Sequence, residues 1–161
     1  MKQTTADETK HYISFSLAGE FFAVDVQQVT QVIQASSFTP VPQAPEFLKG
    51  VTNFNGKIIP IVNLHQKFGF KEPENKDHQL IIILSVLFQD AEVDIGILVD
   101  ASDEVFEWNP EEVKPYPVSG NPEKGAYIEG VINRKNRFSF ILKVNNLFDD
   151  NEIKNITNTE Q

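Results

Sequence analysis

The sequence contains no cysteine, and only one methionine and one tryptophan occur among its 161 residues. The absence of cysteine excludes disulfide bonds and thiolate metal sites, and it fits a protein that folds in a reducing compartment. Basic residues are also scarce, because 14 Lys and Arg stand against 23 Asp and Glu and give a formal net charge of −9. Nucleic acids and anionic membranes attract cationic surfaces, so this balance argues against both as direct partners.

Long apolar runs are missing as well. The longest run, Leu80 to Phe88, is interrupted by Ser85 and is too short to span a bilayer. The first eleven residues lack the apolar core of a secretory signal peptide, so we expect a cytoplasmic protein. The chain is nevertheless 40% hydrophobic and contains 13 Phe, which is enough for a single domain with a substantial core.

Motifs for catalysis and metal binding are absent too. The chain has no phosphate-binding loop, no dinucleotide-binding fingerprint and no nucleophile elbow. Its three histidines, His11, His65 and His78, lack the spacing of metal ligands. These absences predict a protein without catalytic residues, metal or cofactor.

Two acidic clusters resemble sites without meeting their requirements. Asp90, Glu92 and Asp94 alternate as in a calcium loop, but the required glycine is displaced and the final glutamate is missing. The acids between Asp100 and Glu104 could pair as acid and base, yet an acidic chain produces such clusters freely. We interpret both clusters as solvated surface.

The strongest local signal is a β-hairpin. Asn55-Gly56 tolerates positive φ at both central positions of a type I′ turn, and it separates expected strands at Val51 to Phe54 and Lys57 to Leu64. Pro60 removes a backbone donor from the second strand. We therefore expect that strand to lie at a sheet edge or to carry a bulge.

Other segments have the alternation or the apolar content of strands, and short helices are expected only between them. The expected strands are Ile13 to Leu17, Phe21 to Val24, Leu80 to Phe88, Val93 to Val99, Tyr127 to Ile132 and Phe138 to Val144. A one-turn helix is expected after Asn109, and a final short helix is expected around Leu147 and Phe148.

A row of valines follows Asp25, which together with Gln28 resembles a capping box. Val26, Val29 and Val32 recur every three residues, so we expect a short helix that presents them on one side. Since β-branched residues are mediocre helix formers, this helix must be stabilised by burial of its valines. Burial in the core is the simpler interpretation, and burial against a partner is the alternative.

The chain also contains an internal repeat, because three features recur in the same order. Val24-Asp25 recurs as Val99-Asp100, and Gly50-Val51-x-Asn53 recurs as Gly130-Val131-x-Asn133. The third feature, Phe68, recurs as Phe148. The last two pairs share a shift of 80 residues (130 − 50 and 148 − 68), and the first has a shift of 75 (99 − 24). The repeat predicts two similar small β units.

Six further motifs lie between Tyr12 and Phe148. They are Phe15-x-Leu17, Phe22 to Val26, Thr39-Pro40-Val41-Pro42, Phe47-x-Lys49-Gly50-Val51-x-Asn53, Ile59 to Leu64 and Gly96 to Asp100. Through these motifs the chain resembles the CheW coupling proteins of bacterial chemotaxis. The resemblance implies an all-β fold with short helices, in which two five-stranded SH3-like barrels share one core.

We expect a single domain over residues 11–150, with the two barrels divided near residues 71–79 and the C-terminal segment returning to the first barrel. Residues 1–10 and 151–161 are expected to be flexible tails. The resemblance further implies a non-catalytic adaptor without a cofactor. Such an adaptor joins the coiled-coil tip of chemoreceptors to the regulatory domain of a CheA-type histidine kinase, and it meets the membrane only through the receptors.

The family's receptor contact maps onto Ile13, Val26, Val29 and Val32, and the expected groove places Val99 on its other side. For the kinase we expect contacts on the hairpin side, at Gly50, Asn55 and Lys57.

This chain departs from the family at two arginines. The hairpin usually reads Asn-Leu-Arg-Gly, whereas Asn55 stands here at the arginine position, and Gln31 replaces the acid that can pair with it. Because both charges are absent together, we expect Gln31 and Asn55 to lie close enough for a neutral hydrogen bond. Where the family usually has Asp-Leu-Arg at the end of the next strand, this chain has Asn63-Leu64-His65.

Two alternative functions stay open. They are a divergent scaffold for a CheA-type pathway outside chemotaxis and a small-molecule-binding β-barrel.

Overall fold

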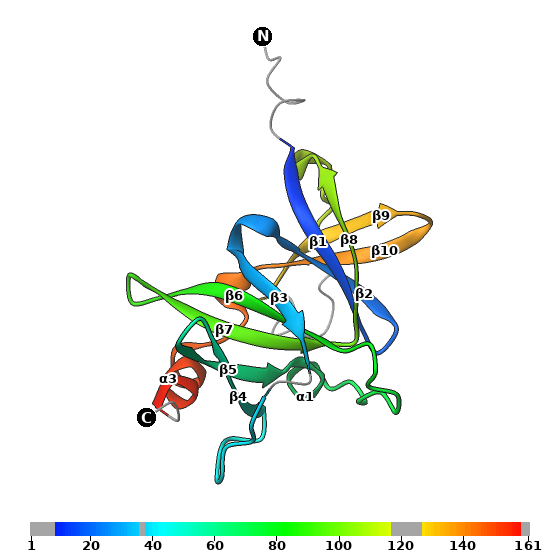
Figure 1. The fold of residues 1–161 in the computed structure, drawn as a ribbon. Coiled ribbons are helices and arrows are strands. Elements are labelled where there is room, and N and C mark those ends of the chain that lie inside the picture. The colour runs from blue at the N-terminus through cyan, green and yellow to red at the C-terminus, as the bar shows by residue number, and fades with distance from the viewer. Residues whose placement is uncertain (1–8, 36–37, 117–126, 159–161) are drawn as a thin grey trace.

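The computed structural model of the protein describes residues 9–35, 38–116 and 127–158, and its strands form two curled five-stranded sheets (Figure 1). The terminal sheet contains strands from both ends of the chain in the order β8-β1-β2-β10-β9. Its strands are β1 (Lys10–Leu17), β2 (Glu20–Asp25), β8 (Ala101–Trp108), β9 (Ile128–Arg134) and β10 (Arg137–Leu142). The central sheet has the order β3-β6-β7-β5-β4. Its strands are β3 (Val29–Gln34), β4 (Leu48–Phe54), β5 (Lys57–Asn63), β6 (Leu80–Phe88) and β7 (Ala91–Val99).

The predicted fold class is confirmed, because the protein is mostly β, with short helices and two SH3-like five-stranded units. The position of the division is corrected. Residues 71–79 join two parts of the central sheet, since β5 before them and β6 after them belong to it. The chain changes sheet between β2 and β3 and again between β7 and β8. A charged, proline-bearing segment marks a solvated connection, but which sheet accepts the following strand depends on pairings distant in sequence.

The repeat is present in the backbone. The β4–β5 hairpin and the β9–β10 hairpin begin 80 residues apart (128 − 48). In each unit the second hairpin strand also pairs in parallel with a strand from another part of the chain, β5 with β7 and β10 with β2. An isolated bridge then closes each hairpin, from Thr39 to Val51 in the central sheet and from Lys114 to Val131 in the terminal sheet.

Pro60 lies in β5, which is an inner strand rather than an edge strand. Its partner across the hairpin is Val51, whose N–H and C=O both bond to the backbone of Thr39 at 2.8 and 2.7 Å. Parallel pairing of β5 with β7 begins one residue later, at Ile61. The missing donor of Pro60 therefore interrupts neither ladder. The register shift between Leu48 and Gly50 places the bulge on β4, so β5 is neither an edge strand nor the bulged strand that was expected.

Alternate residues of the inner strands face two different apolar clusters. Along β6, Ile82 and Leu84 face the main cluster, which both sheets share, whereas Ile81 and Ile83 face a cluster confined to the central sheet. In the terminal sheet, Tyr12 belongs to a third cluster. Both faces of such strands are buried, which explains why Leu80 to Leu84 of β6 are continuously apolar rather than alternating.

The helices differ from the sequence expectation in two places. Residues Val26–Gln28 form a single 3₁₀ turn, and the chain then continues as β3 rather than as a helix. A second 3₁₀ turn, Val144–Asn146, replaces the expected capped helix around Leu147. The one-turn helix after Asn109 is confirmed, because that side chain accepts a hydrogen bond from Glu111 N at 2.9 Å.

The C-terminal segment is an ordered part of the fold up to residue 158. Helix α3 (Asp150–Asn158) buries Ile153 and Ile156 in the main cluster. Glu152 of α3 pairs with Lys67 of α1 (Leu64–Phe68) at 2.9 Å. The expectation of a flexible tail from residue 151 is therefore wrong for 151–158, because two apolar residues at helical spacing give this polar segment a face that the core can bury. Residues 1–8 and 159–161 of the expected tails lie outside the described residues.

No helix in the described ranges is both long and apolar enough to cross a membrane.

Candidate protein-binding surfaces

The valine row lies along the first edge of the central sheet. Asp25 accepts a hydrogen bond from Gln27 N at 2.9 Å and so caps the 3₁₀ turn that begins at Val26. Val29 and Val32 follow on β3, an edge strand that pairs only with β6 within the described sheet. All three valines are half-buried and pack against the main apolar cluster.

A bulge in β3 explains how residues three apart share one face. In a regular strand Val29 and Val32 would point to opposite faces. The pairing register shifts between Val29 and Gln31, which inserts one extra residue and restores the side chains to the same face. The spacing that predicted a helix is therefore produced by a bulged strand.

Two residues of the expected receptor groove lie deeper than the valine row. Ile13 is 8% exposed and Val99 is fully buried, and both belong to the main cluster on which the valines pack. The accessible part of the expected groove is therefore formed by Val26, Val29 and Val32. Burial in the core and burial against a partner were the two interpretations of the valine row. Each describes part of this surface, because each valine has one side in the core and one side in solvent.

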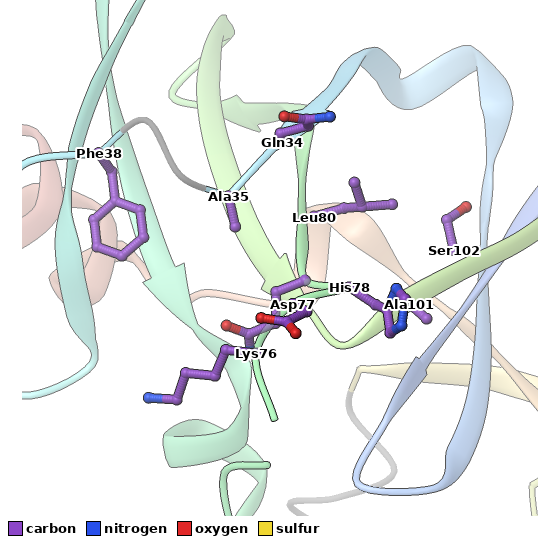
Figure 2. A pocket seen from close by; sticks show the side chains of 10 residues that line it. Gln34, Ala35, Phe38, Lys76, Asp77, His78, Leu80, Ala101 and Ser102 are labelled. Atoms are coloured by element: carbon purple, nitrogen blue, oxygen red, sulfur yellow. The ribbon is translucent and has the colours of Figure 1, made fainter. Parts of the chain in front are cut away.

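A cavity of about 800 Å³ opens beside the end of β3 (Figure 2). Its walls come from the end of β3, from the segment that precedes β6 and from the start of β8. The cavity therefore lies where an edge of the central sheet meets an edge of the terminal sheet. Lining residues include Gln34, Phe38, Lys76, His78, Leu80 and Ala101.

The predicted type I′ hairpin turn is confirmed at the tip of β4 and β5. Asn55 and Gly56 have φ values of 55° and 82°, and Asn53 Oδ1 accepts a hydrogen bond from Gly56 N at 3.2 Å. Asn55 and Lys57 are exposed, and Lys57 Nζ lies 3.2 Å from Asp94 Oδ2. These two predicted kinase-contact residues are thus available to a partner.

Gly50 has a different position from the other two predicted kinase contacts, because it is buried. A Cβ at this position would lie 2.4 Å from the carbonyl oxygen of Thr39. The close approach that requires glycine here is therefore made by the chain's own backbone, which forms the bridge between Thr39 and Val51.

Gln31 and Asn55 are both exposed. Gln31 is on β3, at one edge of the central sheet, and Asn55 is at the end of β4, at the other edge. In the described part of the chain no hydrogen bond joins the two side chains. Their interaction stays a prediction.

The sequence reasoning missed two exposed apolar residues at equivalent places in the repeat. Ile58 on β5 is 50% exposed, and Phe138 on β10 is 63% exposed. They are 80 residues apart (138 − 58), which is the shift of the internal repeat. The repeat could therefore have identified them as equivalent positions. Each lies two residues after a hairpin turn (58 − 56 and 138 − 136), where an exposed apolar side chain can serve as a contact point for a partner.

The acidic cluster near the start of β8 is occupied by structural contacts. Asp100 Oδ2 accepts a hydrogen bond from Ala18 N at 2.7 Å. Glu104 pairs with Arg134 and Lys135. The side chain of Asp103 lies outside the described part of the structure. Within the described ranges, no three His, Asp or Glu side chains gather as a metal site would require.

Comparison with known proteins adds a family assignment to this geometry. The family model of the CheW-like domain matches residues 11–152. The chemotaxis protein CheW of Treponema pallidum is 29% identical over 156 residues, which cover 94% of this chain and 89% of that protein. The chemotaxis protein CheW of Thermotoga maritima is 36% identical over 100 residues, which cover 61% of this chain and 63% of that protein.

A solved structure has the same fold. The crystal structure of the scaffolding protein CheW from Thermoanaerobacter tengcongensis superposes with a TM-score of 0.75 at 32% sequence identity. The match covers 87% of this chain and 88% of that one. The similarity therefore extends over both sheets rather than over one repeat.

Proposed function

Because this chain belongs to the CheW-like family, we propose that it is a non-catalytic adaptor that couples chemoreceptors to a CheA-type histidine kinase in a signalling array. The observation that carries the proposal is the family match over 11–152, which spans both sheets and includes the valine row. The coiled-coil receptor tips would be met in the cytoplasm, and contact with the membrane would be indirect.

The receptor surface we propose is the half-buried valine row. Val26 in the 3₁₀ turn, with Val29 and Val32 on the edge strand that follows, offers aliphatic side chains that a partner helix can cover with its own apolar residues. Ile13 and Val99 support the row from the core. The net charge of −9 argues against a nucleic acid as the partner, because nucleic acids are attracted to cationic surfaces.

For the kinase we propose the β4–β5 hairpin. Asn55, Lys57 and Ile58 are exposed there, so one polar, one charged and one apolar side chain can enter the contact. Gly50 supports the hairpin from within by allowing the bridge to Thr39. In this proposal Gly50 acts on the kinase surface only through the shape of the backbone.

A small-molecule-binding barrel is the competing function, and the cavity beside β3 is the observation that would favour it. Its ionisable residues Lys76, Asp77 and His78 are exposed to solvent rather than enclosed. Ligand sites that perform chemistry usually enclose convergent, perturbed titratable groups. The adaptor function fits this open arrangement better. A scaffold for a CheA-type pathway outside chemotaxis would use the same surfaces, and only the identity of the receptor would distinguish it.

The receptor surface is tested by Val29→Asp, with Thr30→Asp as its matched control. Val29 is half-buried in the valine row, whereas Thr30 is its exposed neighbour on the same strand. A carboxylate at Val29 would be buried without a partner in the complex, which should weaken binding by about 2 to 4 kcal/mol. Isothermal titration calorimetry with a chemoreceptor coiled-coil tip fragment measures this loss.

Circular dichroism separates the outcomes of that experiment. A folded Val29→Asp protein that binds the fragment as tightly as Thr30→Asp would contradict the proposed surface. Unfolding of Val29→Asp alone would show that the valine serves the core.

A further inference from the structure

A small polar cavity lies next to the turn in which the valine row begins. Its volume is about 210 Å³, and its walls come from the start of β1, the end of β2, the start of β9 and the turn after β10. Small-molecule sites usually have about 300 to 1,000 Å³, so this cavity is closer in size to the end of one long side chain. We call it the tyrosine cavity, and its lining residues are Lys10, Tyr12, Asp25, Gln28, Glu129 and residues 141–146.

Tyr12 brings a buried hydroxyl to this cavity. The residue is 1% exposed, and its ring stacks on Phe106 with 5.7 Å between the ring centroids. Within the described ranges the Tyr12 hydroxyl has no hydrogen-bond partner. Because an unpaired buried hydroxyl lowers the stability of a protein, the fold alone does not explain why a tyrosine stands here.

Two carboxylates from different strands line the same cavity. Asp25 stands directly opposite Tyr12 in the pairing of β1 with β2. Glu129 is the extra residue of a bulge in β9, since the pairing of β9 with β10 passes over it. Burial, and then the charges of Glu129 and Asp25, raise the pKa of Tyr12 to about 12. The hydroxyl is therefore protonated at neutral pH, and it lies in the negative potential of both acids.

The lysines of the cavity leave one of these acids without a counter-charge. Lys10 Nζ lies 3.6 Å from Asp25 Oδ2, and the other carboxylate oxygen of Asp25 accepts a hydrogen bond from Gln27 N. Glu129 and Lys143 are both exposed, and in the described part of the chain neither belongs to an ion pair. A cation in the cavity would meet the Glu129 carboxylate and the acceptor lone pairs of the Tyr12 oxygen.

The tyrosine cavity adjoins the proposed receptor surface. Asp25 directly precedes Val26, Gln28 directly precedes Val29, and both polar residues line the cavity. Both valines are half-buried members of the valine row. A helix that covers the valine row therefore passes beside the cavity, within reach of a long side chain.

We propose that the tyrosine cavity accepts the cationic end of a lysine or arginine from the receptor helix that covers the valine row. The Tyr12 oxygen accepts a hydrogen bond from this cation, and Glu129 supplies the opposite charge. Apolar contacts alone allow a helix to slide along the row, whereas a charged contact fixes its register. This inference rests on the proposed adaptor function and deepens it, because it names a side chain that the receptor must carry.

Tyr12→Phe tests the hydroxyl, with Tyr116→Phe as its control, since Tyr116 does not line the cavity. Loss of a hydrogen bond to a charged group should weaken the binding of a chemoreceptor coiled-coil tip fragment about tenfold in isothermal titration calorimetry. The unfolding temperature of free Tyr12→Phe should equal or exceed that of wild type, because the removed hydroxyl has no partner there. A lower unfolding temperature with unchanged affinity would show that the hydroxyl serves the fold, and it would overturn the proposal.

Glu129→Gln tests the charge, and Glu111→Gln is its matched control, because it removes the same charge from an exposed position in the turn after β8. Glu129→Gln should weaken binding of the fragment about threefold, whereas Glu111→Gln should leave it unchanged. Replacing the lysines and arginines of the fragment by glutamine, one at a time, should identify one position at which Glu129→Gln has no further effect. Equal affinities of the two variants, or the lack of such a position in the fragment, would contradict the proposed contact.

Failure of the adaptor function itself would give a different result, because wild-type protein would not bind the fragment at all. Butylguanidinium is then titrated into the free full-length protein while nuclear magnetic resonance follows the amide signals of Gln28 and Asn146, which line the cavity. Saturable shifts that are absent from Tyr12→Phe would support the cation site independently of the receptor. No shifts, or shifts caused by butyrate instead, would overturn it.

Discussion

The two hairpins of the repeat have the same backbone and different surfaces. Both turns have positive φ at their two central residues, Asn55-Gly56 in the central sheet and Lys135-Asn136 in the terminal sheet. In the terminal hairpin the flanking cations are used internally, since Arg134 lies 4.0 Å over the ring of Phe106 and Arg137 lies 3.7 Å over Phe21.

In the central hairpin the flanking cation lies at the surface instead, while the turn residues of both hairpins are exposed. Asn55 is exposed, and Lys57 is exposed with a surface contact to Asp94. The comparison shows that the turn geometry sets the backbone of each hairpin, whereas the neighbouring strands decide whether its charges are held within the protein or offered to a partner.

The two units also differ in the segments that follow their repeated hairpins. After Phe68 the chain continues through Gly69 and residues 71–79 to β6, whereas after Phe148 it forms α3. α3 belongs by sequence to the terminal unit, yet its Glu152 contacts Lys67 of the central unit. The C-terminal helix therefore connects the two units and breaks their symmetry.

The largest expected effect concerns this asymmetry. Ile153 of α3 is 2% exposed, so Ile153→Ala should remove a buried side chain and lower the free energy of unfolding by about 2 to 5 kcal/mol. Chemical denaturation measures the loss. Lys154→Ala, an exposed position on the same helix, is the control and should change stability by less than about 0.5 kcal/mol. Equal stability of the two variants would mean that α3 does not pack as described.

The next largest effect is expected at the two isolated bridges, Thr39 to Val51 and Lys114 to Val131, and it shows whether they contribute equally to stability. A Cβ at Gly50 would lie 2.4 Å from Thr39 O, and one at Gly130 would lie 2.5 Å from Lys114 O. Gly50→Ala and Gly130→Ala should each reduce stability by about 1 to 3 kcal/mol, because a backbone atom cannot move aside as a flexible side chain can. Thermal unfolding measures both.

Thr39→Ala serves as the control for the bridge, because the bridge uses only the backbone of Thr39 and the substitution should have little effect. Clearly unequal losses for the two glycine variants would show that one bridge is not needed for the stability of its unit.

The smallest effect concerns an acid of the central unit. Burial raises the pKa of Glu72, but hydrogen bonds from Asn63 and Lys49 and the charges of Lys49 and Lys76 outweigh it and lower the pKa below its usual range. Glu72 therefore stabilises the protein at neutral pH, and this contribution is lost as the pH falls through its folded-state pKa. Since Glu72 is partly exposed, Glu72→Gln should cost about 0 to 1 kcal/mol at pH 7.

Urea unfolding at a series of acidic pH values checks this expectation. The difference between wild type and Glu72→Gln should shrink as the pH falls, and the exposed Glu74→Gln is the control. A difference that grows towards acidic pH would contradict the assignment.

Burial explains where the structure departs from the groove that the sequence predicts. The sequence predicts Val99 and Ile13 in a groove, but their apolar side chains are equally suited to the core, and only the packing of the two sheets puts them there. In the sequence His65 is a lone histidine without metal-ligand spacing. Its burial between oxygen acceptors depends on Asp100, which is 35 residues away in sequence (100 − 65).

The sequence alone determined the features that depend on neighbouring residues. Asn55-Gly56 defined the hairpin, because Asn-Gly is strongly preferred where both central residues of a turn have positive φ, and the 80-residue repeat identified two similar units. Only the tertiary structure decided which strands share a sheet, and it placed the bulge that turns the valine spacing into one face of β3. Strand pairing joins residues far apart in the chain, so its register depends on the packing of the whole domain and not on any local pattern.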